Sequence, residues 1–132
     1  MNLRTAWLVV AACVLLAAGA RSQGKDVTIS DDDQTTIVDC NAGTATVSGD
    51  DNKVTIKGDC RALTVRGDDN VITAATVNEL SISGDDNTLT VDNVARINVT
   101  GDDNSITWKL GVGGKRPEIS DQGDDNKIRE AK

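Results

Sequence analysis

The chain has 132 residues, of which 14 are basic and 21 acidic, and its formal net charge is −7. Binding to a nucleic-acid backbone depends on clustered Lys and Arg side chains, so this balance argues against nucleic-acid partners and favours cations or basic proteins. The absence of His excludes His-based catalytic triads and His metal ligands.

Residues 1–20 have the features of a secretory signal peptide. Arg4 supplies the positive start, residues 6–18 are almost entirely apolar, and residues 18–20 (Ala-Gly-Ala) form a small-residue cleavage site. The apolar run is shorter than the about 20 residues that a membrane span needs. Cys13 lies in a lipobox-like context, but apolar residues follow it, so cleavage after Ala20 is preferred over lipidation. We therefore expect export to the periplasm or outside the cell, with no membrane span in the processed form.

A repeat follows the short N-terminal extension of residues 21–26. The tetrapeptide Gly-Asp-Asp-Asn begins at Gly49, Gly67, Gly84, Gly101 and Gly123. The starts are 18, 17, 17 and 22 residues apart, and the related sequence of residues 31–34 (Asp-Asp-Asp-Gln) lies 18 residues before the first. Repeats at a fixed period of this kind indicate a repeat architecture.

Apolar and polar residues alternate on both sides of each tetrapeptide. Leu63 and Val65 precede the second copy by four and two residues, and Ile72 and Ala74 follow its Asn at the same spacing. Strict alternation over four to five residues is typical of a strand with one buried face. Gly, Asp and Asn suit the turn between two strands because they tolerate positive φ.

Two all-β architectures are compatible with short strands and frequent turns. One is a β-solenoid of about five to six coils of 17–18 residues over residues 27–108, and the other is an up-and-down β-meander or barrel. A solenoid stacks equivalent residues about 4.8 Å apart, which explains why each turn keeps the same Asn. We therefore predict the solenoid, with a hydrogen-bonded Asn ladder. Its members are Asn52, Asn70, Asn87, Asn104 and Asn126.

Residues 109–132 depart from the pattern. They contain the extra residues of the last repeat, three glycines between positions 111 and 114, and the single proline, Pro117. Terminal repeats of solenoids are usually modified to cover the open end of the stack. We interpret residues 109–132 as a modified last repeat and C-terminal cap.

Two cysteines, Cys40 and Cys60, remain after the predicted processing. Export places them in an oxidising compartment, where an even number of cysteines indicates a disulfide. Cys60 lies seven residues before its next turn glycine, as Val77 and Val94 do, which predicts an inward-pointing column. The alternative is a pair of buried free thiols that pack as small hydrophobic groups.

The succession of Cys40, residues 49–52, Cys60, residues 67–70 and three further turns resembles domain of unknown function family 3060. That family consists of small exported bacterial proteins with repeated Gly-x-x-Asn turns and paired cysteines in the early repeats. The resemblance implies export and a repetitive β fold, and it brings no activity or catalytic residues. This chain departs from the simpler pattern by having Asp-Asp at every complete turn.

The turn carboxylates are candidate ligands for a hard cation such as calcium, which prefers several oxygen ligands. In a stack they would form two columns, in which like charges repel unless cations, splayed side chains or nearby Lys and Arg relieve them. The alternative is that the Asp-Asp pairs only suit the turn conformation and add solubility, without binding a cation. The candidates are Asp50, Asp51, Asp68, Asp69, Asp85, Asp86, Asp102, Asp103, Asp124 and Asp125.

No residue is assigned a catalytic role, because a catalytic site should be one unlike position among many alike, and the turns are all alike. Only the last repeat differs, where Lys115, Arg116 and Glu118 lie beside the glycines.

The leading prediction is an exported, non-enzymatic module that is structural or binds through its repetitive surface, without a cofactor. The alternative is a calcium-dependent binding or structural protein. The sequence identifies no particular ligand or partner.

Overall fold

The structure is a computed structural model, and it describes residues 24–132. The predicted signal peptide and Cys13 lie outside these residues. The described chain forms β1 (Val27–Ile29), β2 (Thr35–Asp39), β3 (Thr44–Ser48), β4 (Lys53–Arg66), β5 (Val71–Ser83), β6 (Thr88–Thr100), β7 (Ser105–Gly111), a 3-10 turn η1 (Val112–Gly114), β8 (Glu118–Asp121) and β9 (Lys127–Glu130).

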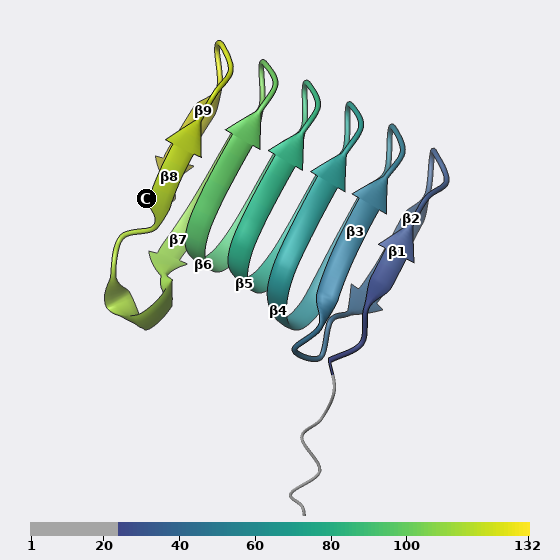
Figure 1. Cartoon of the computed structure of the whole chain (residues 1–132), viewed down its shortest axis with the longest axis horizontal. Helices are drawn as coiled ribbons and strands as arrows, with labels where there is room; N and C mark the ends of the chain where they lie inside the picture. The colour runs from purple at the N-terminus through teal and green to yellow at the C-terminus, as the bar shows by residue number, and fades with distance from the viewer. Residues whose placement is uncertain (1–23) are drawn as a thin grey trace, which may run out of the picture.

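The strands wind into a parallel β-solenoid (Figure 1). Every strand pairing in the described chain is parallel, from β1 with β3 at one end to β7 with β9 at the other. A meander would join neighbouring strands in antiparallel pairs. The prediction of a solenoid is therefore confirmed, and the meander alternative is excluded.

Each complete coil has one tight corner and one gently curved side. The corner is the Gly-Asp-Asp-Asn turn, and β4, β5 and β6 each run from one corner around the curved side to the next as a single bent strand (Figure 1). The first halves of these strands share a face with β2, β7 and β9, whereas their second halves share a face with β1, β3 and β8. All the corners consequently lie along one edge of the molecule.

The core is a set of slender aliphatic columns between the two faces. Leu63, Leu80 and Ile97 stack in register and are each 0% exposed. Cys60, Val77 and Val94 form the predicted inward column on the curved side. Trp108 is also buried, in the column that continues from Val91. Uniform columns of medium-sized side chains fill this narrow space without large aromatic rings, which fits the scarcity of aromatics in the sequence.

The coils differ in length at two places, and both additions lie far from the corners. The extra residue of the 18-residue coil is accommodated at Gly58, where the pairing of β4 with β5 shifts register and φ is +74°. The additional residues of the last coil lie between Gly111, which pairs with Val94, and Glu118, which pairs with Arg96. They form η1 and the segment after it, so the last corner still stacks on the one before.

Residues 109–132 therefore contain a full final coil. Ile119 and Ile128 continue two aliphatic columns, whereas Asp121 and Glu130 end the columns of Val99 and Trp108 with charged side chains. The exposed strand edges of β8 and β9 lie at this end of the sheet. Within residues 24–132, no helix combines the length and apolar character that crossing a membrane requires.

Candidate functional site: the aspartate corners

The corner backbone adopts the same strained conformation in every coil. The second Asp of each corner has a left-handed φ of 55° to 56°, a region that Asp and Asn tolerate better than most residues. The glycine that opens the corner is required by close packing. A Cβ atom on Gly84 would lie 2.1 Å from the carbonyl oxygen of Gly67 in the preceding corner. The glycine thus follows from how closely consecutive corners stack, and the second Asp follows from the left-handed φ at its position.

The five predicted ladder asparagines lie in one column and hydrogen-bond from coil to coil. The Oδ1 atom of Asn87 accepts from the backbone N–H of Asn70 at 3.0 Å and from its Nδ2 at 3.1 Å. The Nδ2 of Asn87 donates to the carbonyl oxygen of Gly67 at 2.9 Å. The same pattern continues to Asn126, and the four asparagines before it are at most 1% exposed. These buried amides satisfy backbone groups that the tight corner leaves unpaired.

The first Asp of each corner has a structural role. Its Oδ1 atom accepts the backbone N–H of the first Asp in the next coil, for example from Asp68 N–H to Asp50 at 2.9 Å and from Asp85 N–H to Asp68 at 2.8 Å. The chain of bonds runs from Asp32 to Asp124. A charged acceptor makes these bonds stronger than neutral ones. The first Asp column therefore joins the corners to one another.

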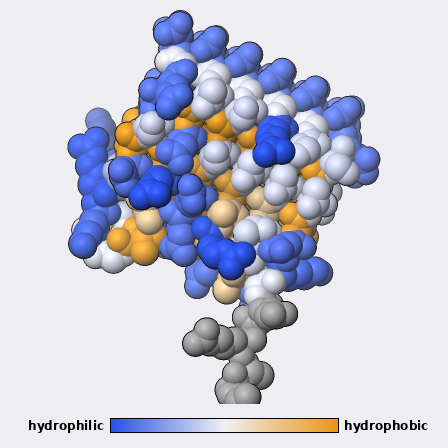
Figure 2. Space-filling model, viewed as in Figure 1, coloured by the Kyte–Doolittle hydropathy of each residue, from blue (hydrophilic) through white to orange (hydrophobic). Residues whose placement is uncertain are grey.

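The second Asp column is different, because no hydrogen bond or ion pair engages its side chains within residues 24–132. Its members, all exposed, are Asp33, Asp51, Asp69, Asp86, Asp103 and Asp125. Partial desolvation, together with the charges of Asp51 and Asp86, raises the pKa of Asp69 above its usual value. Figure 2 shows the hydrophilic edge that the corner loops form. The second Asp column, which lies along this edge, is called the acidic ridge below.

The predicted calcium ligands do not form a compact metal site in the described structure. In residues 24–132, no three Asp, Glu or Cys side chains are grouped so that they could hold a metal ion. The ten predicted carboxylates lie in two columns, and in the first of these one oxygen of Asp50, Asp68, Asp85 and Asp102 is already a hydrogen-bond acceptor. The calcium hypothesis consequently stays a prediction, and it depends on carboxylates from successive coils.

The first corner is the exception to the ladder. Asp31 occupies the glycine position and Gln34 the asparagine position, and the Nε2 atom of Gln34 donates to Asp32 O in its own coil. The side-chain nitrogen of Asn52, which is buried, has no hydrogen-bond partner. The equivalent nitrogen of Asn70 donates to the carbonyl oxygen of Gly49. The first coil is thus joined less completely to the second.

We expect the double substitution Asp31→Gly and Gln34→Asn to stabilise the protein by about 1 kcal/mol. The new asparagine can donate to Asn52 Oδ1, and a glycine lets the corner carbonyl accept from Asn52 Nδ2, at about 0.5–1.5 kcal/mol per bond less the entropy cost of the glycine. Urea unfolding followed by Trp108 fluorescence measures the change. Unchanged or lower stability would show that the unpaired Asn52 amide does not weaken this corner.

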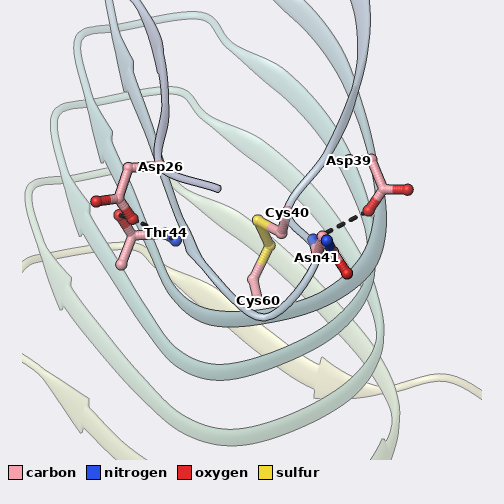
Figure 3. Close-up of a disulfide and its surroundings, with 6 residues drawn as sticks. All are labelled: Asp26, Asp39, Cys40, Asn41, Thr44 and Cys60. Carbon is pink, nitrogen blue, oxygen red and sulfur yellow. Dashed lines mark hydrogen bonds between the residues drawn. A yellow bond between two sulfur atoms is a disulfide. The ribbon is translucent and has the colours of Figure 1, made fainter. Parts of the chain in front are cut away.

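The disulfide predicted between Cys40 and Cys60 is present, and it joins the first two coils on their curved side (Figure 3). The Cα atoms are 5.2 Å apart and both residues are at most 1% exposed. Asp26 and Asp39 lie on opposite sides of it. Asp26 accepts from the hydroxyl and backbone N–H of Thr44, and these bonds lower the pKa of Asp26. The backbone N–H of Asn41 donates to Asp39.

The polar residues of the last repeat do not converge on one site. Glu118 accepts from Arg96 Nε at 3.2 Å and from Nη2 at 3.0 Å, an exposed ion pair between neighbouring coils. Lys115 and Arg116 instead border a shallow hollow beside Trp108 and Glu130. The arrangement of Glu118 is that of a surface ion pair and gives no support to acid–base chemistry.

Sequence reasoning treated the two aspartates of each corner alike and missed their different roles. The signal that could have separated them is their position in the turn, since a type II turn requires a positive φ at its third residue, which is the second Asp of the corner. The hydrogen bond of the first Asp depends on the offset between two stacked corners, and a single sequence does not report that offset.

The fold and the corners define the molecule as a short parallel β-solenoid built from a hydrogen-bonded tetrapeptide repeat. The chain belongs to the family described as Protein of unknown function (DUF3060), whose model matches residues 47–90 and 76–125. These residues span the four coils between the corner at Gly49 and the corner at Gly123. No curated protein and no solved structure matches the chain.

Proposed function

We propose that this protein is an exported, non-enzymatic module that binds cationic groups along its acidic ridge. The observation that carries the proposal is the unequal use of the two Asp columns. The first column is engaged in bonds between coils, whereas the second presents an exposed carboxylate in every coil without a bonding partner in the described chain. A row of carboxylates at the strand spacing offers a repeating negative surface to a basic protein or peptide.

The raised pKa of Asp69 supports the same proposal. Desolvation is the larger cause of this pKa shift, and the charges of Asp51 and Asp86, its neighbours along the ridge, add to it, so the folded protein holds like charges close together. A bound cationic group relieves this repulsion, which gives the ridge a driving force for binding. Because the ridge is exposed, the interaction should weaken with increasing salt.

The experiment measures binding of an oligolysine peptide by calorimetry at low and high salt. We expect binding that weakens at high salt, and a loss of about tenfold or more in affinity when Asp51, Asp69, Asp86 and Asp103 are all changed to Asn, because several charge contacts disappear together. Asn tolerates the left-handed φ, so the corners are retained. Equal affinity of the variant and the parent would contradict the proposal.

A matched control separates the ridge from net charge. The changes Asp59→Asn, Glu79→Gln, Asp92→Asn and Glu130→Gln also remove four charges, all outside the corners. We expect this control to lose much less affinity than the ridge variant. If both variants lose the same amount, binding reflects overall charge and the ridge has no special role.

The second candidate function, calcium-dependent folding or binding, has the same carboxylates as its basis. Thermal unfolding with chelator, with millimolar calcium and with magnesium at equal ionic strength tests it. Calcium would have to raise the unfolding temperature more than magnesium does, and the ridge variant would have to lose that difference. Equal effects of the two ions would leave only general charge screening.

A further inference from the structure

The N-terminal end of the solenoid is open and apolar. β1 pairs only with β3 and β2 only with β4, so one edge of each strand has no partner in residues 24–132. The columns of the core end here in Val27, Ile29 and Val38, which are only partly buried. A hollow of about 700 Å3 lies at this end, bordered by Val27, Ile37 and Val38. Ile37 is 66% exposed, the highest value among the exposed large hydrophobic residues of the described chain.

The opposite end has different chemistry. There, the column of Ile29 ends in Asp121 and the column of Val38 ends in Glu130. Head-to-tail stacking of two copies would place Ile29 on Asp121 and Val38 on Glu130. Asp121 Oδ1 accepts from the backbone N–H of Gly123 at 3.2 Å and from Asn126 Nδ2 at 2.8 Å, and covering it with an aliphatic side chain would still remove its charge from water, which is costly. Inward-pointing charges of this kind protect a strand edge against further pairing.

We propose that the N-terminal end is a dimer interface at which two copies of this chain meet head to head. β2 of one copy pairs antiparallel with β2 of the other, and β1 pairs with β1 in the same way. Antiparallel pairing of a strand with its own copy satisfies the unpaired edge groups of both chains through one twofold axis. It also brings the two Ile37 side chains next to each other on the outer face.

The length of the chain supports a second copy as the occupant. After the predicted cleavage, only residues 21–23 precede Gly24, and three residues span at most about 11 Å. Such a segment is too short to pair along both β1 and β2. If cleavage occurs after Ala20, the processed chain has no segment there that is long enough to pair with both strands.

The charges at this end select one of the two possible twofold arrangements. Antiparallel pairing of β2 with β2 places the corner of one copy, with Asp31, Asp32 and Asp33, over the disulfide side of the other. That side carries Lys25, whose backbone N–H donates to the carbonyl oxygen of Cys40, together with Asp26 and Asp39, so the corner meets one positive and two negative residues there. Pairing β1 with β2 instead would place the two acidic corners against each other. In the proposed dimer the acidic ridges lie on opposite edges, so the assembly presents two of them.

The test is the mass of residues 21–132 in solution, measured by sedimentation equilibrium from about 1 to 100 µM, the range in which moderate dimers dissociate. All of the described contacts lie within these residues. We expect a dimer that dissociates on dilution. Ile37→Lys should convert it to a monomer at every concentration, because it places two like charges together at the twofold axis.

Val71→Lys is the matched control. Val71 is 46% exposed and lies on the same face of the solenoid, but in β5, away from the end. It should leave the dimer intact, and both variants should keep the unfolding midpoint of a folded solenoid. A parent protein that stays monomeric at the highest concentration, or an Ile37→Lys variant that still dimerises, would overturn the proposal. Species that grow beyond a dimer would show head-to-tail stacking instead.

Discussion

Replacement of Asn87 by alanine should lower the free energy of unfolding by about 3–5 kcal/mol. Asn87 is 0% exposed, and its side chain takes part in four hydrogen bonds: three with Asn70 and Gly67 of the preceding corner and one with Asn104 of the following corner. Truncation leaves the Asn70 N–H and the Gly67 carbonyl buried without partners, at about 1–3 kcal/mol for each group. Urea unfolding followed by Trp108 fluorescence and by circular dichroism measures the loss.

Two further variants make this experiment specific. Asn78→Ala changes an exposed asparagine on the curved side and should alter stability by no more than about 0.5 kcal/mol. Asn87→Asp keeps an acceptor for the Asn70 N–H, but an ionised carboxylate cannot donate to the Gly67 carbonyl, so it should also be strongly destabilising. If Asn87→Ala costs less than about 1 kcal/mol, the Asn ladder does not hold the corners together.

Removal of the disulfide by the double substitution Cys40→Ala and Cys60→Ala should cost about 3 kcal/mol. The bond closes a loop with a sequence separation of 20 residues, and cross-linking a loop of this size restricts the unfolded chain by that amount in the entropic model. The double variant avoids a reactive single thiol. The difference in denaturant midpoint between the variant and the parent gives the loss.

The loss should be concentrated at one end of the molecule. In a solenoid each coil contacts only its neighbours, and the disulfide joins the first two coils. Hydrogen exchange should therefore accelerate in β1, β2 and β3 and change little in β6 and β7. Uniform acceleration along the whole chain would instead indicate that the coils unfold as one cooperative unit. Reduction of the parent protein should reproduce the effect of the double variant.

The corners explain how a very acidic tetrapeptide can be repeated through a small domain. The Asn of each corner bonds to the preceding coil and the first Asp bonds to the next coil, so their polarity contributes to the fold. The second Asp supplies the left-handed residue and faces solvent. The left-handed φ accounts for an Asp or Asn in this place, and the repeated use of Asp leaves an exposed charge in every coil.

Much of this molecule follows from the sequence alone, because the same residues recur at nearly constant intervals. A repeat of this kind puts Leu63, Leu80 and Ile97 in one column and Asn70 and Asn87 in another, provided that the coils lie in register. The solenoid, the ladder column and the partners of the disulfide could therefore be derived before any coordinates were known. The departure of residues 109–132 was equally visible in the spacing.

The tertiary structure decided what depends on the distance between coils. The offset between stacked corners determines that the Asp68 side chain accepts from the Asp85 N–H, whereas the Asp69 side chain forms no bond with Asp51 or Asp86 beside it. The close approach of corner backbones makes Gly84 obligatory. The sequence also did not show how the ends of the solenoid differ from its middle. Val38 belongs to a column that is buried in the following coils, but in the first coil nothing in the described chain covers it. Local pattern specifies which residues stack, and only the packed coils show which of their atoms meet.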